Sequence, residues 1–108
     1  MQLDELAKIL AVLIAEQGSY TYVDKLGYSP SKDLAIFYLK EALRDLHSLM
    51  NQEEKMKNEK AKELLKEIKF EYAEKALDEL VRVEDRKTLK EKTSLIGAKA
   101  LAISAGLR

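Results

Sequence analysis

A chain of 108 residues that is 46% hydrophobic and 35% charged has enough apolar material for one packed core and is too apolar to remain disordered. Its 19 basic and 19 acidic residues cancel, which removes the basic excess that favours binding to nucleic acids or anionic membranes, and the lack of cysteine excludes disulfides and thiolate chemistry. The acidic opening is unlike a signal peptide, and no apolar run approaches the ~20 residues of a membrane span. We therefore expect a single domain, residues 1–108, in the cytoplasm.

The first predicted element is a helix over residues 3–17. Its apolar seam is formed by Leu3, Leu6, Leu10 and Leu13, and it is widened enough by neighbouring aliphatic residues to be mostly buried. Gly18 is well placed to end this helix in the left-handed conformation. Residues 21–26 then favour one or two helical turns closed by Gly27, because a lone strand would find no partner elsewhere in the chain.

A second long helix is predicted over residues 31–50. Ser29 is suited to be its N-cap and Pro30 to stand at its first position, since both residue types are favoured where helices start. Its seam has the three- and four-residue spacing of coiled-coil knobs and consists of Ile36, Leu39, Leu43, Leu46 and Met50.

Residues 54–83 predict one long, charged, amphipathic helix, in which no glycine or proline forces a stop. Its apolar face comprises Leu64, Leu65, Ile68, Tyr72, Ala73, Ala76, Leu77, Leu80 and Val81. The start of the segment, Gln52 to Lys60, has Met56 as its one apolar side chain, and we expect it to be exposed. The richness in lysine and glutamate is typical of thermophile proteins as well as of surface helices.

A break is predicted at residues 83–85, with Asp85 as the N-cap of a last helix over residues 87–106. From Thr93 to Leu107 this helix is apolar or small except for Lys99. It could fill the middle of a bundle, it could form a helix–helix interface between subunits, or it could lie on a membrane surface, although the basic face of membrane-surface helices is nearly absent.

These elements predict an all-α fold, a helical bundle of about four helices that includes one long charged amphipathic helix. The predicted core consists of Leu10, Leu13, Leu39, Leu43, Leu46, Leu65, Ile68, Leu77 and Leu101. The apolar faces exceed what one small bundle needs, so we expect a homodimer or higher oligomer. The candidate interface residues are Leu77, Leu80, Val81, Leu101 and Ile103.

Residues 23–31, with Leu26-Gly27 followed by Ser29-Pro30-Ser31, resemble the turn of bacterial and archaeal helix-turn-helix regulators. The resemblance covers about forty residues, and it implies DNA binding by the helix that follows, with dimerisation through the later helices. The candidate DNA contacts are Lys25, Ser31, Lys32 and Lys40. A plain connection between two helices is the alternative, and the net negative charge of this segment favours it, because DNA affinity comes largely from neutralised phosphates.

The sequence shows no convincing catalytic constellation. His47 is the sole histidine and no cysteine is present, so nucleophilic triads are hard to assemble. The many carboxylates lie mostly off the apolar face and predict a solvated surface, and neither a metal site nor a cofactor is expected. The leading hypothesis is therefore a non-enzymatic, self-associating helical interaction or assembly protein, and the alternative is a helix-turn-helix transcriptional regulator.

Overall fold

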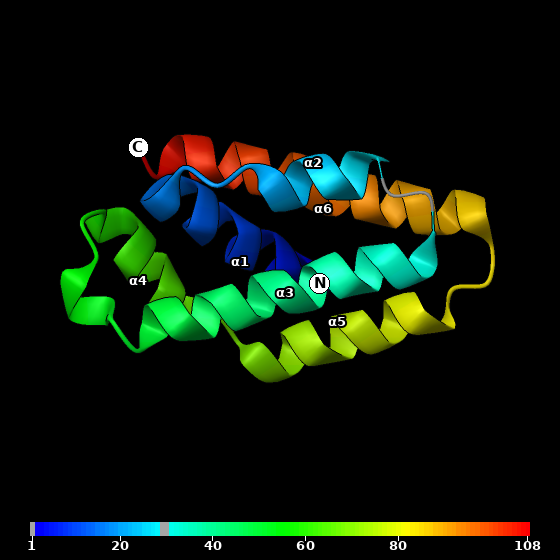
Figure 1. Ribbon diagram of the computed structural model, residues 1–108, viewed down its shortest axis with the longest axis horizontal. Helices are drawn as coiled ribbons and strands as arrows, with labels where there is room; N and C mark the ends of the chain where they lie inside the picture. Colours follow the sequence, from blue (N-terminus) through cyan, green and yellow to red (C-terminus); the bar gives the residue numbers. More distant parts are fainter. Residues whose placement is uncertain (1, 29–30) are drawn as a thin grey trace.

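The computed structural model describes residues 2–28 and 31–108, and all regular structure in these ranges is helical (Figure 1). The helices are α1 (Gln2–Gln17), α2 (Thr21–Tyr28), α3 (Lys32–Met50), α4 (Glu59–Glu67), α5 (Phe70–Arg82) and α6 (Arg86–Gly106), with a short 3-10 turn, η1, at Glu53–Lys55. The all-α class is confirmed. The described residues form six α-helices rather than about four, because the short helix expected near residues 21–26 is a full element and the segment predicted as one helix over residues 54–83 forms two. None of these helices is both long and apolar enough to cross a membrane.

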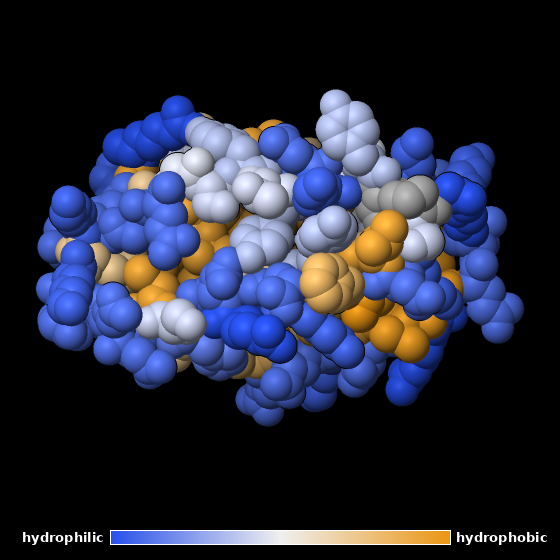
Figure 2. All heavy atoms as spheres, viewed as in Figure 1, coloured by the Kyte–Doolittle hydropathy of each residue, from blue (hydrophilic) through white to orange (hydrophobic). Residues whose placement is uncertain are grey.

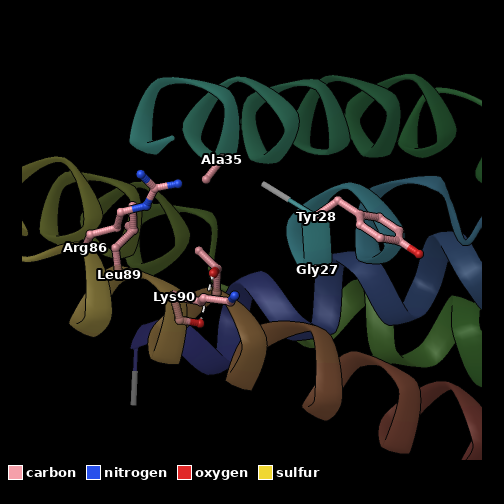
Figure 3. A pocket seen from close by; sticks show the side chains of 7 residues that line it. Gly27, Tyr28, Ala35, Arg86, Leu89 and Lys90 are labelled. Carbon is pink, nitrogen blue, oxygen red and sulfur yellow. Dashed lines mark hydrogen bonds between the residues drawn. The ribbon is translucent and has the colours of Figure 1, made fainter. Parts of the chain in front are cut away.

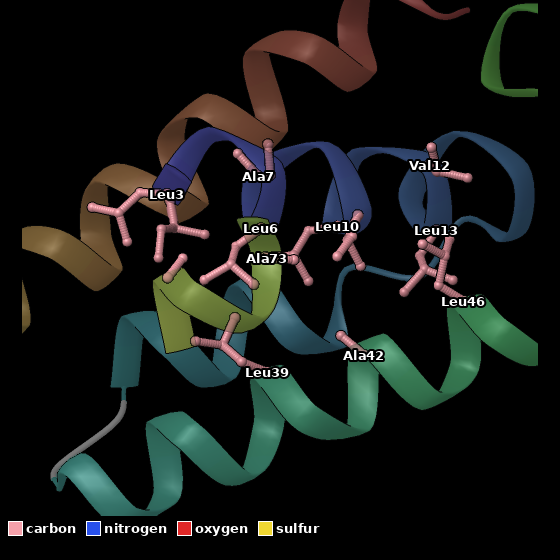
Figure 4. Packing of buried hydrophobic residues seen from close by; sticks show 14 of the residues in the cluster. Leu3, Leu6, Ala7, Leu10, Val12, Leu13, Leu39, Ala42, Leu46 and Ala73 are labelled. Carbon is pink, nitrogen blue, oxygen red and sulfur yellow. The ribbon is translucent and has the colours of Figure 1, made fainter. Parts of the chain in front are cut away.

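Helix α1 occupies the centre of the molecule. It packs against α6, α5, α4 and α3, and ten of its sixteen residues, all of them described, are buried. Figure 4 shows Leu39, Ala42 and Leu46 of α3 pointing at the leucines of α1. The broad apolar stripe of this helix is the physical reason, because no single neighbour could cover it. Helix α6 therefore does not fill the middle of the bundle, which was one of the three placements predicted for it.

The first connection is built partly as the sequence predicts. Gly18 has φ +66° and its N–H donates to the Ile14 carbonyl at 2.8 Å, so it ends α1 in the left-handed conformation. Gly27, in contrast, lies inside α2 and does not close it. The N-cap of α3 is Ser31, whose Oγ accepts a hydrogen bond from the Leu34 N–H at 3.3 Å. The predicted N-cap, Ser29, and Pro30 lie outside the described residues.

The prediction of one long charged helix over residues 54–83 is wrong. Its first residues form η1 and a loop, and the remainder is divided into α4 and α5 at Ile68 and Lys69, which have extended backbone. Met56 is 7% exposed and belongs to the core, so the expectation that this start is exposed is wrong at that residue. The start of α6 is confirmed, since Asp85 caps it by accepting from the Thr88 N–H at 2.9 Å.

Two carboxylates of α1 accept hydrogen bonds from the backbone where the charged segment breaks. Glu5 is buried, and its Oε2 accepts from the Lys69 N–H at 2.8 Å, just before α5. Glu16 accepts from the N–H groups of Lys57 and Asn58 at 2.7 and 3.2 Å, just before α4. The two glutamates are eleven residues apart, which is about three turns, so they project from the same side of α1. They therefore bind backbone donors at both ends of α4.

Helix α5 is also stabilised at its other end by a distant side chain. The Lys32 ammonium donates to the carbonyls of Val81 and Val83 at 2.8 and 2.7 Å. A carboxylate before the N-terminus and a cation at the C-terminus both complement the helix dipole. These contacts fasten α5 to α1 and α3.

Most of the predicted core is buried: Leu10, Leu13, Leu39, Leu46, Leu65, Ile68 and Leu77. Leu43 is partly buried and packs against this cluster. Leu101 is 42% exposed, which corrects its assignment to the core. The inward side of α6 is instead formed by residues such as Ile96, Gly97 and Ala100. Leu101 therefore points away from α1.

Candidate interaction surfaces

The outward side of α6 is apolar. Leu95 and Leu101 are 41% and 42% exposed, and Ala98, Ala102 and Ala105 are also exposed. We call these five residues the α6 face. Lys99 is the one charged residue between Thr93 and Leu107, and its ammonium lies 2.6 Å from Asp4 Oδ1 on α1. A helix that is apolar all round is normally buried on all sides, whereas α1, α2 and α3 pack against α6 on one side and leave the α6 face exposed.

A second exposed apolar group lies where the start of α3 meets the end of α5. Leu34, Phe37 and Val81 are 40%, 52% and 50% exposed, and we call them the α3–α5 patch. Figure 2 shows hydrophobic residues gathered at this place on the front of the molecule. The two helices run antiparallel: Lys32 binds the Val81 carbonyl at one end, and the His47 and Phe70 rings stack 4.9 Å apart at the other.

The five candidate interface residues are divided by the fold. Val81 and Leu101 are exposed and remain candidates, while Ile103 is partly buried against the core. Leu77 and Leu80 are 6% and 0% exposed. Because they are already covered within one chain, these two are not available to a second one, and their assignment is corrected.

The four candidate DNA contacts do not come together on one surface. Ser31 caps α3, and Lys32 is bound to the end of α5. The Lys25 ammonium lies 5.8 Å from the centre of the Tyr38 ring, on the α2 side of α3. Lys40 is exposed two residues after Tyr38, which places it about 200° further around the same helix.

Helices α2 and α3 lie side by side as a hairpin (Figure 1). The Tyr22 hydroxyl near the start of α2 donates to the carboxylate of Asp45, near the end of α3. Burial of the phenol, this hydrogen bond and the negative charges of Asp45 and Glu41 raise the pKa of Tyr22 well above its ordinary value. The phenol therefore stays protonated and fastens α2 along α3. Helix-turn-helix motifs instead cross at about 90–120°.

A cavity of about 220 Å³ lies between α2, α3 and α6. Its lining consists of Gly27, Tyr28, Ala35, Arg86, Leu89, Lys90 and Thr93 (Figure 3). The lining holds two cations and two hydroxyl groups, those of Tyr28 and Thr93, and the Thr93 hydroxyl donates to the Lys90 carbonyl at 3.2 Å. The Tyr28 ring points away from Arg86 and Lys90. None of these seven residues is a carboxylate or an imidazole, the groups that most often serve as general bases.

The acidic residues are dispersed rather than clustered. Across residues 2–28 and 31–108, no group of three or more His, Asp or Glu side chains is placed to hold a metal ion. Several carboxylates instead have structural partners. Thr88 lowers the pKa of Asp85 through hydrogen bonds from its hydroxyl and its N–H, and Lys99 lowers the pKa of Asp4. The features of this chain that fit a binding role are thus its two exposed apolar surfaces.

Comparison with known proteins places the chain in a family without assigning it an activity. No family model and no solved structure matches it. An uncharacterized protein of Archaeoglobus fulgidus is 67% identical over 107 residues, which make up 99% of this chain and 91% of the relative. At that identity and coverage, the chain belongs to the same family as the A. fulgidus protein.

Proposed function

We propose that this chain is a small, non-enzymatic helical assembly protein of the cytoplasm, and that the α6 face joins two copies of it. The observation that carries the proposal is the apolar circumference of α6 from Thr93 to Leu107, which the chain itself covers on one side only. Contiguous apolar surface of this kind in a water-exposed helix usually marks a protein–protein contact.

The α6 face is self-complementary in shape. Leu95, Ala98, Ala102 and Ala105 recur at intervals of three, four and three residues, which is the spacing of a helix–helix seam. In a two-fold dimer, each residue i that contacts residue j is matched by j contacting i. Two antiparallel α6 helices centred near residue 100 would set Leu95 against Ala105 and Ala98 against Ala102. Large side chains then meet small ones, and the backbones approach closely.

Light scattering of a Leu101→Glu variant tests the proposal. The wild-type chain should have at least twice the 12.3 kDa of one copy, and the variant should have about half the wild-type mass, because it buries a carboxylate in an apolar contact. Tyr72→Glu is the matched control, since Tyr72 is exposed at 38% on α5 and two lysine ammonium groups lie beside its ring. A wild-type monomer at high micromolar concentration, or an unchanged mass in Leu101→Glu, contradicts the proposal.

Fluorescence anisotropy with duplex DNA separates this role from that of a regulator. An assembly protein with no net charge should not bind the duplex even at low salt. Binding that weakens steeply with added salt would instead indicate neutralised phosphates and would support the helix-turn-helix alternative. In that case, DNA binding should be abolished by Lys25→Glu and by Lys40→Glu, and it should be unaffected by Leu101→Glu.

A further inference from the structure

Where α3 and α5 border each other, each helix exposes a pair of charged residues, and the two pairs have opposite sign. On α3, the exposed residues Lys40 and Arg44 form a basic stripe. On α5, the exposed residues Glu74 and Asp78 form an acidic stripe. Helical spacing places each stripe on the side of its helix that borders the other, outward of the His47–Phe70 stack.

The two stripes are not paired with each other within one chain. Among the described residues, no ion pair joins them, and Arg44 lies 3.2 Å from Glu41 of its own helix instead. The Arg44 side chain is 76% exposed, and an exposed pair of this kind contributes little, so the guanidinium is easily redirected. The α3–α5 patch of Leu34, Phe37 and Val81 lies at one end of the same surface.

We infer that the α3–α5 surface binds the same surface of a second copy, with α3 of each protomer lying over α5 of the other. A two-fold axis parallel to the helices produces this arrangement. It sets the basic stripe of each copy against the acidic stripe of its partner, and it sets the two apolar patches against each other. The alternative, α3 over α3, would bring like charges together, and that arrangement is strongly disfavoured.

The charges at the two ends of the α3–α5 surface agree with this pairing. The contacts of Lys32 with Val81 and of His47 with Phe70 define which residues of α3 and α5 lie at the same height along the two antiparallel helices. On that scale Asp33 is level with Arg82 and Arg44 is near Glu74, so opposite charges face each other at both ends of the paired surface.

The area is also sufficient for a specific contact. Helix α3 has 19 residues. At about 1.5 Å per residue it is roughly 28 Å long, and two adjacent helices present a face roughly 18 Å wide. Two such faces together would bury about 1,000 Å², which is near the lower limit for a biological interface. Helix α1 separates this surface from α6, so dimers formed through α6 could assemble further (Figure 1). The inference extends the proposed function but depends on different residues.

The test uses Leu101→Glu as its background, so that only the α3–α5 surface remains. In sedimentation velocity experiments this variant should form a dimer of twice 12.3 kDa. Adding Arg44→Glu or Glu74→Arg should each weaken that dimer about tenfold or more, because each puts like charges in contact. Lys60→Glu is the control, since it makes a similar change of charge at an exposed position on α4.

Mixing the two single variants gives the sharpest result. A dimer of one Arg44→Glu chain and one Glu74→Arg chain has opposite charges at both contacts, so the mixture should associate as strongly as the background protein. Each variant chain by itself has like charges at positions 44 and 74, so an ion pair within one chain cannot restore association in the mixture. Failure of the mixture to associate overturns the inference, as does an unchanged dimer in either single variant.

The two proposals fail in different ways. A Leu101→Glu protein that is monomeric at high micromolar concentration overturns the α3–α5 interface and leaves the α6 interface standing. A Leu101→Glu protein with the wild-type mass overturns the α6 interface, and the charge reversals then test the α3–α5 surface directly. If circular dichroism shows that Leu101→Glu is unfolded, Leu95→Glu replaces it as the background.

Discussion

Helix α1 and the part of α6 from Thr93 to Leu107 have similarly apolar sequences but different positions in the fold. Ten of the sixteen residues of α1 are buried, against six of the twenty-one residues of α6. Helix α1 is surrounded by its own chain, whereas α6 presents Leu95 and Leu101 to solvent. The difference shows that apolar composition predicts that a helix is buried, but it does not predict whether the same chain or a second one covers it. For α1 the cover is intramolecular, and for α6 we propose that a second copy supplies it.

Matched leucine truncations should give the largest difference between the two helices. Leu10 on α1 is 1% exposed, so Leu10→Ala should lower the free energy of unfolding by about 2–5 kcal/mol through lost burial and a residual cavity. Leu101→Ala should lower the stability of one chain by less than about 1 kcal/mol, because the side chain is already partly hydrated. Urea denaturation at low protein concentration measures both. Equal losses would mean that Leu101 is a core residue after all.

Removal of the Glu5 carboxylate should have a smaller effect, confined to the contact of α1 with α5. Glu5→Ala leaves the Lys69 N–H without its acceptor and should lower the free energy of unfolding by about 1–3 kcal/mol. Glu5→Gln keeps an acceptor oxygen and should lose less. The Lys69 amide should exchange its hydrogen faster in the alanine variant, as measured by NMR. If that amide stays protected, another group must hold the break between α4 and α5.

The Asp4–Lys99 pair joins α1 to α6 and should have the smallest effect. The Lys99 ammonium holds the pKa of Asp4 below its ordinary value, so the pair stabilises the fold above the unfolded pKa of about 3.9 and loses this effect as pH falls through the folded pKa. Both side chains are about one-third exposed, so Asp4→Asn should lower stability at pH 7 by only about 0.2–1 kcal/mol. In denaturation at several pH values, the difference from wild type should shrink and then vanish as pH falls through the folded pKa of Asp4. A difference that persists below that pKa would not be electrostatic.

The two breaks in the second half of the chain show what local sequence can predict. The break before α6 was predicted, because Asp85 caps a helix whose Thr88 lies three residues away. The break at Ile68 and Lys69 was not, because no residue there disfavours helix and the acceptor for Lys69 is Glu5, distant in sequence. Neither the burial of Glu5 nor its partner could be identified without the fold.

The candidate interface was predicted only in part, again because contacts between helices cannot be identified from the sequence. Leu77, Leu80 and Val81 are close together on α5, and the sequence offered no way to tell which of them turns toward α1. The fold covers Leu77 and Leu80 and leaves Val81 in solvent, beside residues of α3 that were not candidates, such as Phe37. Helical periodicity identifies an apolar face, but the neighbouring helices decide which residues of that face are buried within the chain.

The sequence by itself determined the all-α class, the end of α1 at Gly18 and the start of α6 at Asp85, because each depends on residues within a few positions of one another. The tertiary structure alone decided that the charged segment divides into α4 and α5, that Met56 is buried, and that α1 rather than α6 is central. These features depend on hydrogen bonds and packing between groups far apart in the chain, and such contacts exist only after the helices have come together.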